Sequence, residues 1–143
     1  KPGPFTPDER QTMNRHAAIG ASILGKSRIE LFQLASEIAL THHERWDGQG
    51  YPNQLAGEDI PLSGRIVAVV DFYDALTMNR VYRPAFSHEK VLEMLMAERG
   101  RAFDPAIVDC FMRSNIAMSA VRERVTNQQM TFSDLIQNEP VNP

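Results

Sequence analysis

Helix start signals recur along this chain, and no stretch shows the strict alternation of polar and apolar residues that is typical of a β-strand. Thr6-Pro7-Asp8-Glu9 provides an N-cap, a proline at the first helical position and a capping-box glutamate, which predicts a helix over 7–25. Ser27 and Glu30 repeat the pattern before a second helix that we expect to end near Trp46. Further helices are expected at about 63–79, from Ser87 to Gly100, from Asp104-Pro105, and up to the neighbourhood of Arg124. The sequence therefore predicts an all-α fold, a bundle of about five to six helices.

The size and charge of the chain exclude several classes of protein. Its 143 residues fit one domain, and a net charge of -3 disfavours binding to DNA, RNA or an anionic membrane. Cys110 is the only cysteine, so no intrachain disulfide can form, and no stretch approaches the roughly 18 apolar residues of a membrane span. We expect a soluble, cytoplasmic protein.

The most unusual segment is HHERWDGQGYP, which begins at His42 and His43. It opens a stretch over 47–62 that has no helical periodicity and is rich in glycine and proline. A loop of this length inside a compact domain is more often functional than a passive connection.

Histidines adjoin the apolar faces of the first two predicted helices. The face of the second helix continues in register to His42 and consists of Leu31, Leu34, Ala35 and Ile38. His16 lies beside the face of the first helix, which consists of Met13, Ala17, Gly20 and Leu24. Both imidazoles are therefore expected to point inward.

The third predicted helix has two carboxylates on the face that Val67 and Val70 define, namely Asp71 and Asp74. An ionised carboxylate that is buried without a partner is strongly destabilising, so a cation is expected between these helices. Imidazole nitrogens and carboxylate oxygens together suit iron, manganese, zinc or a similar divalent metal. The predicted metal cluster consists of His16, His42, His43 and Asp71.

Each of these residues also has an ordinary interpretation. A single helical histidine such as His16 is more often a structural residue than a ligand, and one of two adjacent histidines is usually solvated. An aspartate pair three residues apart is usually an exposed face, here with Arg80 or Arg83 as a surface partner. Alternatively, these two arginines lie beside the metal cluster and bind phosphate oxygens.

Three segments of the chain resemble the HD-GYP family of cyclic di-GMP phosphodiesterases, in the HD phosphohydrolase superfamily. They are HHERWDGQGYP at 42–52, PLSGRIVAVVDFYDALTMNRVYR at 61–83 and RGRAFDP at 99–105. The resemblance runs from KPGPFT to about Met112 and includes the motif Gly50-Tyr51-Pro52 that names the family. We therefore expect residues 1–125 to form the C-terminal part of an HD-GYP-like domain, truncated at its N-terminus, and residues 126–143 to form a tail.

The resemblance implies roles for residues of this chain. His16, His42, His43 and Asp71 match the family's metal-ligand positions, while Asp74, Arg80 and Arg83 match positions around the substrate's phosphates. The intact domain is expected to hold two or three ions, iron or manganese, and to hydrolyse cyclic di-GMP to pGpG and then GMP. The Gly50-Tyr51-Pro52 loop is associated in the family with docking of diguanylate-cyclase (GGDEF) domains.

The chain departs from the family in one respect, because the His-Asp dyad that names the superfamily is absent from it. The chain opens at Lys1, at the loop that follows the dyad in the family, which indicates a piece of a longer protein. We expect a chain without the dyad to bind metal weakly, incompletely or not at all, to show little or no hydrolysis, and to form a homodimer over newly exposed apolar surface. The alternatives are a non-catalytic module that binds a cyclic dinucleotide or a protein, and an HD-type phosphohydrolase for another nucleotide.

Overall fold

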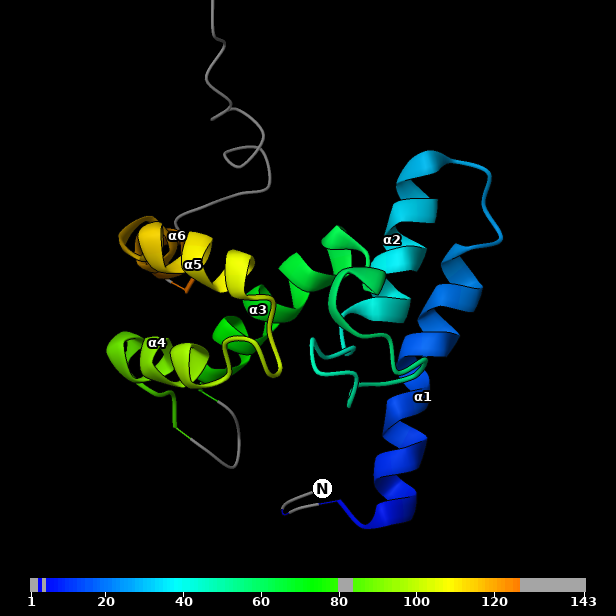
Figure 1. Ribbon diagram of the computed structural model, residues 1–143, viewed down its shortest axis with the longest axis horizontal. Coiled ribbons are helices and arrows are strands. Elements are labelled where there is room, and N and C mark those ends of the chain that lie inside the picture. The colour runs from blue at the N-terminus through cyan, green and yellow to red at the C-terminus, as the bar shows by residue number, and fades with distance from the viewer. Residues whose placement is uncertain (1–2, 4, 80–83, 127–143) are drawn as a thin grey trace, which may run out of the picture. The chain divides into compact units, whose positions relative to one another are not determined.

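The structure is a computed structural model that describes residues 3, 5–79 and 84–126. Over these residues it contains helices and no strand, so the predicted all-α class is confirmed (Figure 1). The helices are α1 Pro7–Leu24, α2 Glu30–Thr41, the 3₁₀ helix η1 Gly57–Asp59, α3 Leu62–Thr77, α4 His88–Ala97, α5 Pro105–Arg113 and α6 Asn115–Thr126. The chain divides into two compact units, residues 1–110 and 111–143.

The first helix begins as its sequence predicts. The side chain of Thr6 accepts a hydrogen bond from the backbone N–H of Glu9, and the Glu9 carboxylate accepts one from the N–H of Thr6. This reciprocal capping box satisfies two donors that the helix itself leaves free. The predicted helix over 7–25 is confirmed to within one residue.

The second helix differs from its prediction at both ends. Its N-cap is Ile29, which forms no side-chain capping bond, so Ser27 does not repeat the capping box. The helix ends at Thr41 and not near Trp46. The backbone N–H of Trp46 instead donates to the carbonyl of Ala102 at 3.1 Å, so a contact distant in sequence takes the donor that a longer helix would use.

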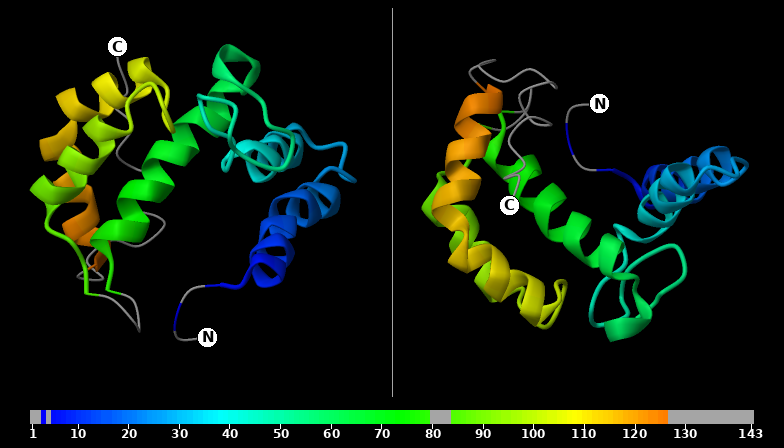
Figure 2. Two further views of the ribbon diagram at one scale, coloured as in Figure 1. Left: turned by 60° about the horizontal axis from the view of Figure 1, so that its bottom comes forward. Right: turned by 90° about the horizontal axis from the view of Figure 1, so that it is seen from above.

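Helices α1 and α2 pack side by side through small residues (Figures 1 and 2). Ala17 and Ala21 of α1 are buried, and the Ser36 hydroxyl of α2 donates to the carbonyl of Ala21 at 2.9 Å. The predicted apolar faces are wrong at their large residues, because Met13 of α1 and Leu31 of α2 are 46% and 70% exposed. Alanines allow the two helix axes to approach closely, and this turns the larger side chains outward.

The third helix packs against α2 and α4 with a face other than the predicted one. The residues it buries are Gly64, Val69, Tyr73 and Thr77. Asp71 and Asp74 are exposed, and so is Val70 at 45%. Asp71 follows Val69 by two residues, or about 200° around the helix, which directs it away from the core. The expectation that both aspartates occupy core positions is therefore wrong.

The remaining elements of the first unit are fixed by caps and by one buried ion pair. Ser87 caps α4, as predicted, by accepting from the N–H of Lys90. Asp104 is 4% exposed, accepts from the N–H of Ala106, and pairs with the Arg65 guanidinium at 2.7 Å. This pair joins α3 to the start of α5.

The tail predicted over 126–143 lies outside the described residues, with the exception of Thr126. Arg80 and Arg83 also lie outside them. In the ranges that the structure describes, no helix combines the length and the apolar character that a membrane span requires.

Candidate metal centre

Three imidazoles meet where α1 approaches the end of α2. His16 lies in α1, His42 is the C-cap of α2, and His43 follows it. Each offers one ring nitrogen, and these three atoms lie within 4.8 Å of one another. The Nε2 atoms of His16 and His43 are 3.1 Å apart. The structure therefore brings together the three histidines that the sequence singled out.

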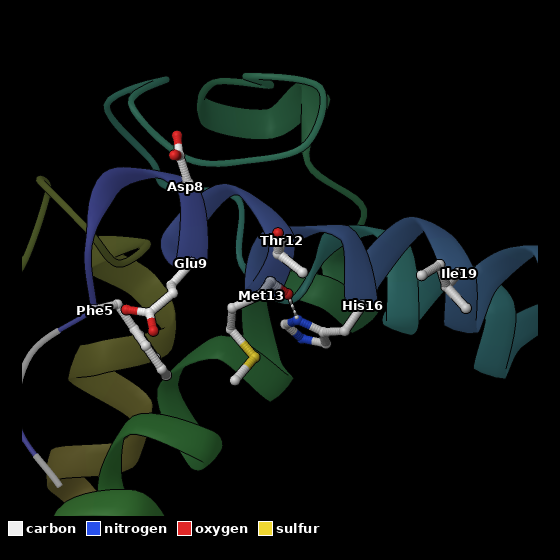
Figure 3. Close-up of a pocket in the computed structure, with 7 residues that line it drawn as sticks. All are labelled: Phe5, Asp8, Glu9, Thr12, Met13, His16 and Ile19. Carbon is white, nitrogen blue, oxygen red and sulfur yellow. Dashed lines mark hydrogen bonds between the residues drawn. The ribbon is translucent and has the colours of Figure 1, made fainter. Parts of the chain in front are cut away.

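Two of the rings are oriented by backbone carbonyls. Nδ1–H of His16 donates to the carbonyl of Met13 at 2.6 Å, as Figure 3 shows. Nδ1–H of His42 donates to the carbonyls of Ile38 and Ala39, each at 3.0 Å. A carbonyl can only accept, so both rings carry their proton on Nδ1 and keep a lone pair on Nε2. Histidines that ligate metals are commonly held in this way.

His43 stays neutral over a wide range of pH. Its burial, and secondly its proximity to His42 and His16, lower its pKa from 6.5 to about 4, although the Asp71 carboxylate opposes this decrease. A neutral imidazole has a lone pair available for a metal, whereas a protonated imidazole has none.

The donor set fits a divalent metal. Two nitrogens that each lie about 2.1 Å from one ion, at right angles, are about 3 Å apart, which is close to the 3.1 Å between His16 and His43. Imidazole nitrogens are ligands for zinc, iron, copper and nickel, and added carboxylate oxygens also suit manganese. His16, His42 and His43 could therefore hold such an ion.

Asp71 lies beside this cluster and not within it. It lines a cavity of about 340 Å³ together with His42 and His43. The cavity is otherwise mostly apolar, and its other lining residues are Glu44, Arg45, Ala68, Phe72, Ala75, Leu76, Ala102 and Phe103. Among the described residues, the set of ligand atoms within 4.8 Å contains only the three histidines. Asp71 as a ligand stays a prediction.

The predicted phosphate-binding residues are described only in part. Asp74 is exposed on α3 and is not one of the described residues that line the cavity. Arg80 and Arg83 lie outside the described residues.

A second cavity, of about 510 Å³, follows the exposed side of α1 and reaches His16 (Figure 3). Its lining is mostly apolar, with Phe5, Met13 and Ile19 beside the acidic Asp8 and Glu9. His16 is the one residue of the cluster that lines this cavity.

The Gly50-Tyr51-Pro52 loop closes onto the cluster. Gly50 is buried, and a Cβ there would overlap the backbone of Glu44 and Arg45, so only glycine fits. The Tyr51-Pro52 peptide is cis. The Tyr51 ring stacks on His43, with the ring centroids 4.8 Å apart and the planes 30° apart.

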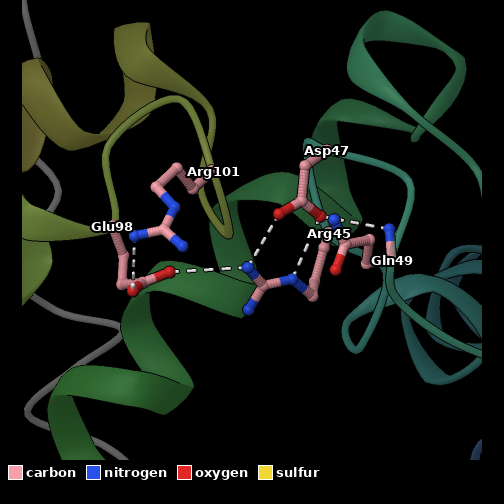
Figure 4. Close-up of polar contacts among 5 residues, drawn as sticks. All are labelled: Arg45, Asp47, Gln49, Glu98 and Arg101. Carbon is pink, nitrogen blue, oxygen red and sulfur yellow. Dashed lines mark hydrogen bonds and ion pairs between the residues drawn. The ribbon is translucent and has the colours of Figure 1, made fainter.

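An ionic network holds the turn that follows the cluster (Figure 4). Arg45 donates two hydrogen bonds to Asp47 at 3.1 and 2.8 Å, and lies 3.5 Å from Glu98. The hydrogen bond from Arg45 lowers the pKa of the Asp47 carboxyl. Asp47 also accepts from the N–H of Gln49, which fixes the start of the loop.

Sequence reasoning missed Glu44, which is 3% exposed and accepts hydrogen bonds from the N–H groups of Asn53 and Leu55. No periodicity marks it, because it lies beyond the end of α2. It also missed the pair of Arg65 with Asp104, although an aspartate directly before Pro105 predicts an N-cap there.

The fold and the site together define an all-α domain with a cluster of three imidazoles that could hold a metal ion, two of which line a mostly apolar cavity. The family model for the HD domain matches residues 1–107. The chain therefore belongs to the HD domain family.

The similar proteins confirm the HD-GYP resemblance. A "Cyclic di-GMP phosphodiesterase" of Vibrio cholerae is 50% identical over 117 residues, which cover 78% of this chain and 24% of that protein. A "3'3'-cGAMP-specific phosphodiesterase 2" of the same organism is 45% identical over 122 residues, which cover 85% and 23%. The chain thus spans about a quarter of the length of these curated relatives.

A solved structure has the same fold. The cyclic GMP-AMP specific phosphodiesterase V-cGAP3 of V. cholerae matches with a TM-score of 0.61 over 97% of this chain and 31% of that one. Its sequence is 23% identical, so this likeness concerns the fold alone.

Proposed function

We propose that this chain is the metal-binding part of a phosphodiesterase that hydrolyses cyclic di-GMP to pGpG and then GMP. The observation that carries the proposal is the meeting of three imidazoles, two of which donate Nδ1–H to backbone carbonyls and so carry a lone pair on Nε2. Two of the three, His42 and His43, line the cavity of about 340 Å³. Relatives that are named cyclic di-GMP phosphodiesterases support the choice of substrate.

Within this proposal His16, His42 and His43 are metal ligands, and Asp71 is a fourth that reaches the ions from the wall of the cavity. The ions are two or three, iron or manganese. When bound, they supply Lewis-acid polarisation of a phosphoryl oxygen and a hydroxide nucleophile at neutral pH. The low pKa of His43 keeps its lone pair free.

The chain's other residues bind and orient the substrate. Asp74, Arg80 and Arg83 are proposed to lie around its phosphates, with the guanidinium groups neutralising charge as it develops on the phosphoryl oxygens. Phe72 and Phe103 form part of the apolar wall of the cavity that His42, His43 and Asp71 also line.

A second candidate substrate is 3'3'-cGAMP, because a relative with 45% identity is named for it. Parallel assays with both dinucleotides distinguish the two. A third candidate is a non-catalytic module, which would bind one of these dinucleotides or a protein without turnover.

The Gly50-Tyr51-Pro52 loop is the proposed contact for a diguanylate-cyclase domain. Pro52 is exposed, while Gly50 is buried and Tyr51 is half-buried against His43, so a partner would meet the loop at Pro52 and beyond. Homodimerisation and a cytoplasmic location also stay predictions.

The test measures metal content by plasma mass spectrometry and Co²⁺ affinity by visible absorption. We expect His42→Ala and His43→Ala to weaken Co²⁺ binding at least about tenfold. His88→Ala is the matched control, because His88 bonds the Tyr73 hydroxyl and lies outside the cluster. Equal binding by all variants, or no binding by the wild type, would contradict the metal centre.

Activity is assayed alongside, with cyclic di-GMP and either Mn²⁺ or Fe²⁺. Because the chain contains no His-Asp dipeptide, we expect little or no pGpG from these 143 residues. Release of pGpG that His42→Ala abolishes would show that the dyad is dispensable.

A further inference from the structure

Glu44 is a buried carboxylate whose hydrogen bonds go to a single loop. It is 3% exposed, and its two oxygens accept from the N–H of Asn53 at 2.7 Å and from the N–H of Leu55 at 3.0 Å. A buried charge is tolerated only where donors compensate it, and here both donors belong to the segment directly after Pro52. Glu44 therefore holds the C-terminal side of the Gly50-Tyr51-Pro52 loop in place.

The near end of the same loop is held by the backbone next to Glu44. Gly50 packs so closely on the backbone of Glu44 and Arg45 that a Cβ would not fit. The N–H of Tyr51 donates to the carbonyl of His43 at 3.2 Å. The loop is thus fixed on both sides of the Tyr51 ring.

His43 is the ring that this loop can orient. His16 and His42 are each held by an Nδ1–H bond to a backbone carbonyl. In the part of the chain that the structure describes, Nδ1 of His43 has no such bond. Its ring instead contacts the His42 ring, with the centroids 4.0 Å apart, and stacks on the Tyr51 ring, with the centroids 4.8 Å apart. His42 and His16 belong to the cluster itself, so Tyr51 is the ring outside the cluster that packs on this imidazole and can set its angle.

We propose that Glu44 is a positioning residue for the metal centre: its carboxylate holds the 50–55 loop closed, the loop keeps Tyr51 stacked on His43, and the stack directs Nε2 of His43 toward His16. This inference rests on the proposed function, since the positioning serves metal binding. It assigns the Gly50-Tyr51-Pro52 loop a role inside this chain, separate from any docking of a partner.

The test uses the 143-residue chain with Glu44→Ala and Glu44→Gln. The first readout is the nuclear Overhauser effect between the Tyr51 ring and the His43 imidazole in metal-free protein, and the second is Co²⁺ affinity. We expect Glu44→Ala to lose the Overhauser effect and to weaken Co²⁺ binding about 10- to 100-fold. Glu44→Gln has one acceptor oxygen in place of two, so an intermediate loss is expected.

Val91→Ala is the control for a purely structural effect. Val91 is fully buried in α4 and lies outside the loop and the cluster, so its truncation lowers the melting temperature without opening the loop. We expect Val91→Ala to keep both readouts. If Glu44→Ala keeps them too, or if Val91→Ala loses them equally, the positioning role is overturned.

A second pair of variants tests the positioning role if Glu44→Ala does not fold. Tyr51→Leu removes the stacked ring and leaves the Glu44 hydrogen bonds in place, whereas Tyr51→Phe restores the ring. We expect Co²⁺ affinity to fall with leucine and to recover with phenylalanine, and equal affinities would overturn the proposal. If wild-type protein binds no Co²⁺, the proposed function fails, while the Overhauser effect still tests whether Glu44 keeps Tyr51 stacked on His43.

Discussion

The three imidazoles of the site differ in how their rings are held. His16 and His42 donate Nδ1–H to carbonyls of their own helices, so helix geometry alone presents their Nε2 atoms. His43 lies beyond the helix and depends on the loop that stacks Tyr51 upon it. Burial, together with the proximity of His42 and His16, lowers the pKa of His43 and keeps this ring neutral.

The lowered pKa of His43 predicts that metal-free protein loses stability in mild acid. In the unfolded chain this histidine has a pKa of 6.5, while in the folded chain the pKa is about 4. The unfolded state therefore takes up a proton first as the pH falls, and stability is lost between about pH 6.5 and pH 4. After allowance for solvent screening of a half-buried ring, the loss is about 1 to 2 kcal/mol.

Guanidinium denaturation in EDTA at pH 7 and pH 4.5 measures this loss. His43→Phe keeps a ring against Tyr51 but cannot titrate, so its loss over the same interval should be smaller by the predicted amount. Equal losses in the two proteins would show that His43 does not contribute.

At the residue level, part of the site could be predicted from the sequence. The sequence grouped the three histidines because it placed them beside inward-facing helix faces. The structure brings them together, but the expectation that His16 points inward is wrong, because His16 is exposed. The exposure of Asp71 could not be predicted from the sequence, because α3 has apolar residues around much of its circumference. Val67 and Val70 suggest one face and Val69 with Tyr73 another, and only packing against α2 and α4 selects the second.

At the scale of elements, the site depends on the close approach of α2 to α3. A Cβ at Gly64 would overlap the side chain of Thr41, the last residue of α2. Thr41 immediately precedes His42, so the close contact between α2 and α3 fixes the position of the backbone at His42 and His43. The end of α2 could not be predicted from local sequence, because the bond from Trp46 to Ala102 joins residues far apart in the chain.

Gly64→Ala is expected to destabilise the protein by about 2 to 3 kcal/mol, since the new methyl group overpacks a buried contact. Thr41→Ala removes the nearest atom, the hydroxyl Oγ1, and so relieves part of the overlap. The double variant should therefore lose less stability than the sum of the two single losses. Chemical denaturation of all four proteins completes the cycle.

Gly20→Ala provides the matched glycine control for that cycle. A Cβ at Gly20 would meet only the Cβ of Ala39 at 3.5 Å, an ordinary contact. Alanine also favours a helix interior over glycine by about 0.5 to 1 kcal/mol, so this variant should be neutral or more stable. Losses that simply add in the Thr41 and Gly64 cycle would contradict the close crossing.

At the scale of the whole molecule, all three histidines lie in the compact unit of residues 1–110, and none lies in residues 111–143. The family match covers nearly the same part, residues 1–107. An ion that binds the cluster should therefore stabilise the first unit directly. Whether the second unit is stabilised as well shows whether the two units unfold together.

A metal that binds only the folded state should stabilise the first unit by an amount set by mass action, about 2.7 kcal/mol at a free concentration 100 times its Kd. Hydrogen exchange with and without Mn²⁺ measures this for each helix. Amides of α1 and α3 should gain protection, and those of α6 should gain little, because α6 lies in the other unit. His16→Ala should abolish the gain, since it removes a ligand from the cluster while leaving the buried residues of α1 unchanged. Equal protection of α6 and α1 would show one cooperative body in place of two, and a gain that survives His16→Ala would place the ion at other residues.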